Sequence, residues 1–297
     1  MGLGISFGFR YPNAGRDIAA LGATWVREII AWGQVEPNAV GAPDWIYYDA
    51  LLGSFRRIKQ AVPGARVILT VRAKSDWAGK IIVGAQRSAT RPPASIGRYE
   101  SFLRQLRDRS AGLVDVWQIE NECDWANYWA GSAAEYLALV SAACGVVGPE
   151  AVALCGWTSS TTEEASGCLP IAHPRMVAFA RYVMENRPMM IWADAHCYGA
   201  TGNVAAQLLW LGMHIDNSRI LCTELGPPSR LAGKARLDDL EARLRAAGEH
   251  SAAALWFLLR DTTAPGIPPA WQHNGLVEET GARKPEFATF QAVAKGL

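Results

Sequence analysis

Short apolar runs alternate with segments of helical spacing along the whole chain. Runs rich in β-branched and aromatic residues predict strands, whereas apolar residues three or four positions apart predict helices. We expect strands at residues 5–9, 25–30, 65–71, 113–120, 151–156, 190–196, 220–224 and 253–259. We expect helices at residues 16–21, 46–61, from 95 to beyond 106, 132–147, 174–186, 203–214, around 237–247 and at 285–294.

This order favours a single α/β domain, a closed (β/α)8 TIM barrel that spans residues 1–297. No linker interrupts the series. A doubly wound open sheet is the alternative, but its glycine-rich phosphate turn would follow the first strand, whereas Gly2-Leu3-Gly4 precedes it. In a barrel, the C-terminal ends of the strands converge on the active site.

One connection is much longer than the others, at residues 72–94. It contains Trp77, an apolar segment at 81–83 and the pair Pro92-Pro93. A loop of this length inside a compact domain is more often a functional wall or lid than a spacer.

Composition excludes several classes of protein. Half of the residues are hydrophobic and 19% are charged, which predicts a large core and argues against disorder. The formal net charge is +1, with no basic cluster, so we expect neither nucleic acid nor an anionic membrane as a partner. No apolar run approaches the roughly 18 residues that a membrane span requires. We expect a monomer.

The first residues show no secretory signal, so both a cytoplasmic location and secretion after trimming stay open. The six cysteines show no C-x-x-C pairing, and we interpret them mainly as small buried apolar residues. If any disulfide forms, Cys144 and Cys168 are the expected pair.

Polar and titratable side chains gather at the ends of the predicted strands. The fourth strand ends in Glu120-Asn121-Glu122 and the seventh in Glu224. The second strand carries Arg27, the sixth carries Asp194, His196 and Tyr198 on one face, and the eighth carries Trp256. Strands four and seven lie across a barrel from each other, and two facing carboxyl groups are what glycoside hydrolysis requires.

This arrangement resembles the clan A glycoside hydrolases, which are retaining enzymes on β/α barrels. Asn121-Glu122 is similar to their acid/base motif, and Thr223-Glu224-Leu225-Gly226 to their nucleophile motif. The similarity extends over essentially the whole chain, through Arg27, His196-Cys197-Tyr198, Trp256, Gly275-Leu276-Val277 and Lys284-Pro285-Glu286-Phe287. The chain departs from many members at Cys123, where they have proline.

The resemblance implies double displacement on β-linked oligo- or polysaccharides. Glu224 would attack the anomeric carbon while Glu122, with a raised pKa, protonates the leaving oxygen and later activates water. Arg27 and Tyr198 would stabilise the Glu224 carboxylate. Asn121 would bind the sugar 2-hydroxyl, His196 would support Glu122 or a substrate hydroxyl, and Trp256 would form the floor of the subsite. No metal ion and no organic cofactor is expected.

Tryptophans after strands can stack on sugar rings. Six lie in or near such segments, and we expect about half of them to line the cleft: Trp32, Trp77, Trp125, Trp129, Trp157 and Trp271. The segment from Asp124 to Trp129 is the best candidate for a subsite wall. The identity of the sugar and the choice between endo and exo action are not determined by the sequence.

Several alternatives stay open. Strict alternation places Glu120 on the same face as Glu122, so Glu120 is a rival acid/base. Arg27 could instead form a structural ion pair with Glu28 or another carboxylate, and His196 could be a core histidine. A Schiff-base aldolase on the same barrel would need a lysine at a strand end, for which Lys74 is the candidate. A carbohydrate-binding barrel without catalysis is the alternative from another class.

Overall fold

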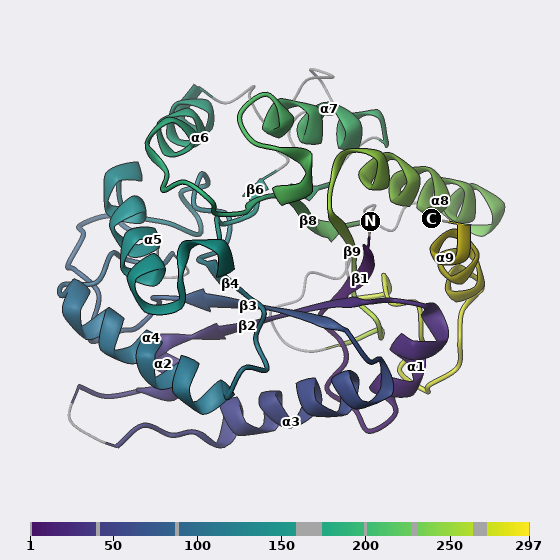
Figure 1. Cartoon of the computed structure of the whole chain (residues 1–297), viewed down its shortest axis with the longest axis horizontal. Coiled ribbons are helices and arrows are strands. Elements are labelled where there is room, and N and C mark those ends of the chain that lie inside the picture. Colours follow the sequence, from purple (N-terminus) through teal and green to yellow (C-terminus); the bar gives the residue numbers. More distant parts are fainter. Residues whose placement is uncertain are drawn as a thin grey trace.

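The computed structural model describes residues 2–39, 42–86, 89–158, 174–198, 201–226, 231–263 and 272–296. In these ranges a nine-stranded parallel sheet curls inside a ring of helices (Figure 1). The strands are β1 (Gly2–Ser6), β2 (Trp25–Ala31), β3 (Arg66–Arg72), β4 (Val116–Ile119), β5 (Val152–Ala153), β6 (Trp157–Thr158), β7 (Ala193–Cys197), β8 (Ile220–Leu225) and β9 (Ala253–Phe257).

The α-helices are α1 (Ala14–Leu21), α2 (Trp32–Val35), α3 (Ile46–Ala61), α4 (Ile96–Ser110), α5 (Ala133–Val147), α6 (Pro174–Asn186), α7 (Thr201–Gly212), α8 (Gly233–His250) and α9 (Pro285–Gly296). Two short 3-10 helices, Pro149–Ala151 and Asn217–Arg219, precede β5 and β8. The expected α/β alternation is confirmed. The sequence pattern did not reveal α2, because four residues are too few to show a helical period.

The fifth predicted strand, 151–156, is observed only as β5, and a second short strand, β6, begins beyond its predicted end. Hydrogen-bonded neighbours follow the order β5-β4-β3-β2-β1-β9-β8-β7-β6, so the two ends of the sheet are consecutive in the chain. Between them, Leu154 N donates to Trp192 O at 2.9 Å and Trp192 N donates to Val152 O at 2.8 Å. The observed sheet therefore has nine strands where eight were expected, with residues 154–156 separating β5 from β6.

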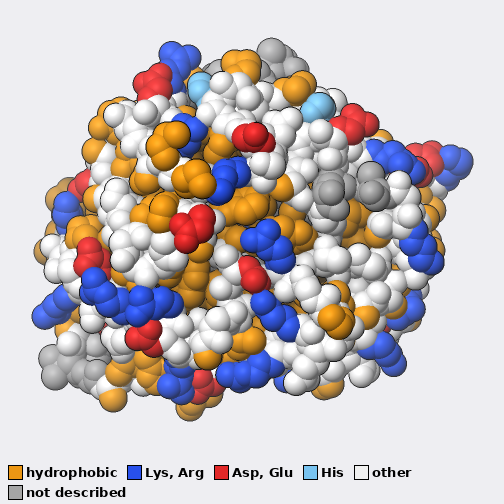
Figure 2. Space-filling view, viewed as in Figure 1, with side chains coloured by type: hydrophobic (Ala, Val, Ile, Leu, Met, Phe, Trp, Pro, Cys, Tyr) orange, Lys and Arg blue, Asp and Glu red, His pale blue; other side chains and the backbone are white. Residues whose placement is uncertain are grey.

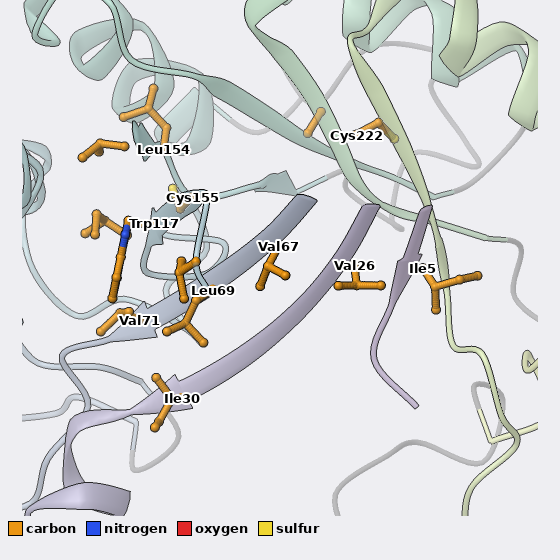
Figure 3. Packing of buried hydrophobic residues seen from close by; sticks show 14 of the residues in the cluster. Ile5, Val26, Ile30, Val67, Leu69, Val71, Trp117, Leu154, Cys155 and Cys222 are labelled. Atoms are coloured by element: carbon orange, nitrogen blue, oxygen red, sulfur yellow. The ribbon is translucent and has the colours of Figure 1, made fainter. Parts of the chain in front are cut away.

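Strand alternation divides the apolar residues of the sheet between two clusters. One cluster faces the helices and includes Val26, Val67, Leu69 and Trp117 (Figure 3). A smaller cluster occupies the opposite, inner face and is formed by Trp25, Ile68, Val116, Ala153, Trp192, Leu221, Ala253 and Leu255. This inner cluster lies at the N-terminal halves of the strands, below the polar residues described next.

The long connection after β3 packs against the segment that follows β4. Thr90 N donates to Tyr128 O at 2.7 Å, and Ala130 N donates to Thr90 O at 2.9 Å. The loop is also closed on itself, because Lys80 N donates to Pro92 O at 2.8 Å. Residues 78–80 thus pair with residues 92–94, and Thr90 pairs with the segment 128–130.

Acidic and basic side chains are interspersed over the face shown in Figure 2, with apolar side chains gathered near its centre. Within the described ranges, no helix is both long enough and apolar enough to cross a bilayer. Cys144 carries a free thiol, and Cys168 lies outside the described residues.

Candidate active site

Polar side chains replace apolar ones further along the inner face of each strand. A step of two residues keeps the same face, so the residues that follow the inner apolar cluster also point inward. These positions carry Arg27, Thr70, Gln118, Asp194 and Thr223, all fully buried. The site is thus a polar layer above an apolar one.

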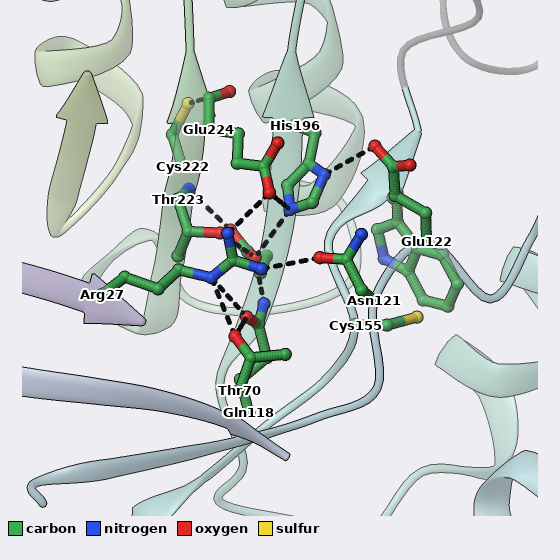
Figure 4. Close-up of polar contacts among 12 residues, drawn as sticks. Arg27, Thr70, Gln118, Asn121, Glu122, Cys155, His196, Cys222, Thr223 and Glu224 are labelled. Carbon is green, nitrogen blue, oxygen red and sulfur yellow. Dashed lines mark hydrogen bonds and ion pairs between the residues drawn. The ribbon is translucent and has the colours of Figure 1, made fainter. Parts of the chain in front are cut away.

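Arg27 lies at the centre of this layer (Figure 4). Its Nη1 donates to Glu224 Oε1 at 2.6 Å, and its Nη2 donates to Asn121 Oδ1 at 2.7 Å. Its Nε donates to Gln118 Oε1 at 2.7 Å and to Thr70 Oγ1 at 2.9 Å. One guanidinium group therefore joins β2, β3, β4, β8 and the segment after β4.

Arg27 does not pair with its neighbour Glu28. Glu28 faces the other side of β2 and pairs with Arg10. The alternative of a local ion pair is therefore wrong, because adjacent residues of a strand point to opposite faces.

Asp194 supports the layer from β7. Its Oδ1 accepts from Thr223 N at 2.9 Å, and its Oδ2 accepts from Thr223 Oγ1 at 2.5 Å and from Gln118 Nε2. Burial raises the pKa of Asp194, although His196, Arg27 and the Thr223 hydrogen bonds oppose the shift. Sequence reasoning did not select Thr70, Gln118 or Thr223, yet strand alternation from the inner apolar cluster would have found all three.

A bulge in β8 brings Glu224 into the site beside Thr223. Ala195 pairs with Cys222 but His196 pairs with Glu224, so β8 has one extra residue at this point. Such a bulge re-aims side chains, and here two consecutive residues both point inward.

The environment of Glu224 favours its anion. Burial raises the pKa of Glu224, but the charges of His196 and Arg27 and the hydrogen bonds from Tyr198 and Arg27 outweigh burial, so the pKa is lowered overall. Tyr198 donates its hydroxyl to Glu224 Oε2. Glu224 is therefore held ionised and oriented at the same time.

A sharp turn places Asn121 and Glu122 together. β4 ends at Ile119, and the backbone of both Glu120 and Glu122 is left-handed, with φ of 66° and 49°. The turn is closed by a hydrogen bond from Trp125 N to Glu122 O at 3.0 Å. Strict alternation therefore ends before Asn121, which lets both Asn121 and Glu122 face the site.

Glu120 is directed away from the other carboxylates. Its Oε1 accepts from Ala73 N, and its Oε2 lies 3.6 Å from Arg72 Nε. Burial raises the pKa of Glu120, although Arg72 and the Ala73 hydrogen bond oppose the shift. The structure thus brings Glu122, and not Glu120, next to His196.

His196 lies between three carboxylates. Its Nδ1 is 2.8 Å from Glu122 Oε1, and its Nε2 is 3.6 Å from Glu224 Oε1 and 3.7 Å from Asp194 Oδ2. Burial lowers the pKa of His196, but Glu224 and Glu122 outweigh burial and Arg27, so the pKa is raised. His196 therefore contacts the carboxylates of the site, which goes beyond the role of a core histidine.

One oxygen of Glu122, one oxygen of Glu224 and one nitrogen of His196 all lie within 4.8 Å of one another. This spacing is compatible with a divalent cation. However, Arg27 already contributes a positive charge to Glu224, and a second cation would be repelled by it. The geometry therefore favours a proton-transfer site over a metal centre.

Only part of the predicted aromatic wall is accessible. Trp125 is 39% exposed, and its ring lies 5.5 Å from that of Tyr128. Trp77 is half-buried and donates its Nε1 to Glu36 O at 2.7 Å. Trp271 lies outside the described residues.

The expected roles of Trp129 and Trp157 in substrate binding are corrected by the structure. Both are 1% exposed and belong to the cluster between sheet and helices. Trp129 packs against Tyr136 and Trp157 against Phe179. Trp32 is buried as well, stacked on Phe102. Their ring faces are covered by protein and cannot stack on a sugar.

The same correction applies to Trp256. It is fully buried in the cluster between sheet and helices, where its Nε1 donates to Asn274 O at 3.0 Å. Because strand faces alternate, the inward residue is Phe257, whose ring lies 6.2 Å from Tyr198 and 5.6 Å from Phe7. Phe257 therefore occupies the position expected for Trp256.

Lys74, the candidate lysine for a Schiff base, follows β3. It contributes to a cavity of about 390 Å³, which is lined by Ile29, Ala31, Gly33, Gln34, Arg72, Lys74, Ser75 and Asp76. Ile29 and Ala31 continue the inner face of β2 beyond Arg27. The strand that carries Arg27 therefore also contributes to the lining of this cavity.

No protein-family model matches the chain, and no curated protein matches it. Among solved structures, a GH5_18 protein from Bifidobacterium longum subsp. infantis matches 100% of this chain and 79% of its own, with a TM-score of 0.75 and 14% identity. A GH5_18 variant from Bifidobacterium longum subsp. longum, in complex with Manβ1-4GlcNAc, matches 100% of this chain and 78% of its own, with a TM-score of 0.72 and 14% identity.

A family 39 glycoside hydrolase from Bacteroides cellulosilyticus WH2 is similar over 99% of this chain, with a TM-score of 0.69 and 15% identity. The match covers 63% of that protein's chain. These likenesses show a shared fold.

Proposed function

We propose that the protein is a retaining glycoside hydrolase that cleaves β-linked oligo- or polysaccharides. The observation that carries the proposal is the pair Glu122 and Glu224, with oxygens within 4.8 Å of each other in a buried polar layer. Retaining enzymes separate their carboxyl groups by about 5–5.5 Å, whereas inverting enzymes separate them by about 6.5–9.5 Å. The shared fold with glycoside hydrolases supports the same conclusion.

In the first step, Glu224 attacks the anomeric carbon and the bond from that carbon to the leaving oxygen breaks. Glu122 gives its proton to that oxygen, which departs as an alcohol. The lowered pKa of Glu224 keeps the nucleophile ionised, and Arg27 and Tyr198 orient it. The product of this step is a glycosyl ester of Glu224.

In the second step, Glu122 takes a proton from water, and the water oxygen displaces Glu224 from the sugar. His196 contacts both carboxylates, so it compensates their charge as the proton moves. Asn121, fixed by Arg27, is placed to bind the sugar 2-hydroxyl. Trp125 and Phe257 are the aromatic side chains that we assign to the walls of the cleft, and the enzyme is proposed to act as a monomer.

We further propose that the sheet functions as a closed (β/α)8 barrel in one domain. The hydrogen bonds between Trp192 and residues 152 and 154 support this, because they join the two ends of the sheet. β5 and β6 would then be one barrel strand interrupted at 154–156.

β-Mannosides are the first substrates to test, since a neighbour in fold was solved with Manβ1-4GlcNAc. The panel also includes aryl β-glucosides, β-xylosides and β-galactosides and the corresponding polysaccharides. Product configuration is followed by NMR immediately after cleavage. We expect the β-anomer to appear first.

Variants of the two carboxylates test the mechanism. Glu224→Ala is expected to lose activity by at least about 10⁴-fold, and azide should restore turnover with formation of an α-glycosyl azide. Glu120→Gln is the matched control, because Glu120 is a buried carboxylate of the same turn that faces away. An inverted first product, or near-normal activity of Glu224→Ala, would refute the proposal.

A further inference from the structure

Asp124 is a buried carboxylate that the proposed reaction does not use. It is 3% exposed, and no lysine, arginine or histidine of the described residues forms an ion pair with it. Its Oδ1 accepts from Thr158 Oγ1 at 2.9 Å, and its Oδ2 accepts from Thr158 N at 3.1 Å. A buried charge without a cationic partner is costly, so its position calls for a functional explanation.

The contacts of Asp124 lead back to Glu122 from two directions. Along the chain, Asp124 lies two residues after Glu122, in the turn that the bond from Trp125 N to Glu122 O closes. Through space, Thr158 pairs with His196 in the register of β6 and β7, and His196 Nδ1 lies 2.8 Å from the Glu122 carboxyl group. Asp124 therefore fixes the turn of Glu122 to the strand next to the imidazole that Glu122 contacts.

The charges of the two carboxylates also interact. Burial raises the pKa of Asp124 to about 7, with a further contribution from the negative charge of Glu122, while the Thr158 hydrogen bonds oppose the shift. The titratable groups that face Asp124 are Glu122 and the Cys123 thiol.

We propose that Asp124 is a positioning residue, which holds the turn of Glu122 against β6 and so orients the Glu122 carboxyl group for its donation of a proton to the leaving oxygen. This inference rests on the proposed function. Asp124 itself does not contact the sugar. Its effect is therefore confined to steps in which Glu122 transfers a proton.

The leaving group separates this role from a general structural one. A 2,4-dinitrophenyl glycoside departs without protonation, whereas a phenyl glycoside of the same sugar needs the acid. We therefore measure kcat/KM, which reports the first step, for both substrates with wild-type protein, Glu122→Ala, Asp124→Asn and Thr158→Val. Asp115→Asn is the matched control, because Asp115 also accepts from a backbone amide, Val67 N, but precedes β4 at its opposite end.

Glu122→Ala should lower kcat/KM for the phenyl glycoside by about 10²- to 10⁴-fold and leave the dinitrophenyl glycoside nearly unchanged. Asp124→Asn should lower the phenyl value by about tenfold, with less than about a twofold change for the dinitrophenyl glycoside. Thr158→Val should lower the ratio of the phenyl to the dinitrophenyl kcat/KM in the same way, but to a smaller extent.

An equal loss of kcat/KM on both substrates in Asp124→Asn would overturn the inference. If Asp124→Asn does not fold, the same comparison of kcat/KM between the phenyl and dinitrophenyl glycosides is made with Thr158→Val, and an equal loss on both substrates overturns the inference. If Glu122→Ala shows no dependence on the leaving group, the proposed function fails instead, so the two failures are distinguishable.

Discussion

Arg27→Met should destabilise the protein more than any substitution of a surface arginine. Methionine keeps the length of the side chain but removes all four hydrogen bonds to Glu224, Asn121, Gln118 and Thr70. Breaking a buried ion pair from one side costs about 3–5 kcal/mol, because it leaves the other charge buried and unpaired. For a chain of this size we expect the melting temperature to fall by on the order of 10 °C.

A double-mutant cycle tests the cause of this loss. Thermal and urea unfolding are measured for wild-type protein, Arg27→Met, Glu224→Gln and the double variant. Glu224→Gln removes the charge that Arg27→Met leaves unpaired, so the double variant should recover part of the stability. Arg109→Met is the control, since Arg109 pairs with Asp49 at the exposed surface and should have little effect.

The pH dependence gives a second readout in the same variants. The lowered pKa of Glu224 means that its ion pair contributes stability above the unfolded pKa, and that this contribution is lost as the pH falls through the folded value. Arg27→Met should reduce this acid-side loss. Additive effects of Arg27→Met and Glu224→Gln, within about 0.5 kcal/mol, would refute the reasoning.

Three further expectations follow from the site. Trp125→Ala should raise KM with little change in melting temperature, because Trp125 is exposed. Trp256→Ala should destabilise the fold by about 3–5 kcal/mol, because Trp256 is fully buried. Steady-state kinetics and thermal unfolding distinguish the two variants, and the reverse pattern would contradict the assignment. The pKa of Asp124 is raised from 3.8 to about 7, so its contribution to stability is present below about pH 4 and lost as the pH rises through 7. In Asp124→Asn, the free energy of unfolding, measured with urea, should depend less on pH over that range. An unchanged dependence on pH would argue against this expectation. Dialysis against EDTA should leave activity unchanged, because Arg27 already supplies positive charge to Glu224. Loss of activity in EDTA would point to a metal enzyme.

Strand periodicity predicted the fold class and part of the site. The alternation of β7 correctly placed Asp194 and His196 on one face, and the apolar strand β2 correctly isolated Arg27 as an inward charge. The bounds of α3 and α6 agree with the predicted ranges, because both helices have clear apolar periods and defined ends. These are local properties that a sequence records directly.

The remaining features depend on departures from periodicity. Asn121 and Glu122 share the site only because of a left-handed turn, and Thr223 and Glu224 share it only because of a bulge. Neither departure has a marker such as glycine at the residue concerned, so the preference for Glu122 over Glu120 came from a family resemblance. The role of Trp256 also came from the resemblance. The inward face of β9 is set by its pairing with β1, which places Phe257 and not Trp256 in the site.

The turn after β4 and the bulge in β8 have a consequence for protein design. Grafting Glu122 and Glu224 onto the ends of two regular strands would direct one neighbour of each carboxylate outward, into the helices. A transplant would need to include Ile119 to Thr158 with its Asp124 anchor, and Cys222 to Leu225 with the inserted residue. The unit to transfer is thus the left-handed turn after β4 together with the bulge in β8, because these two irregularities orient the carboxylates.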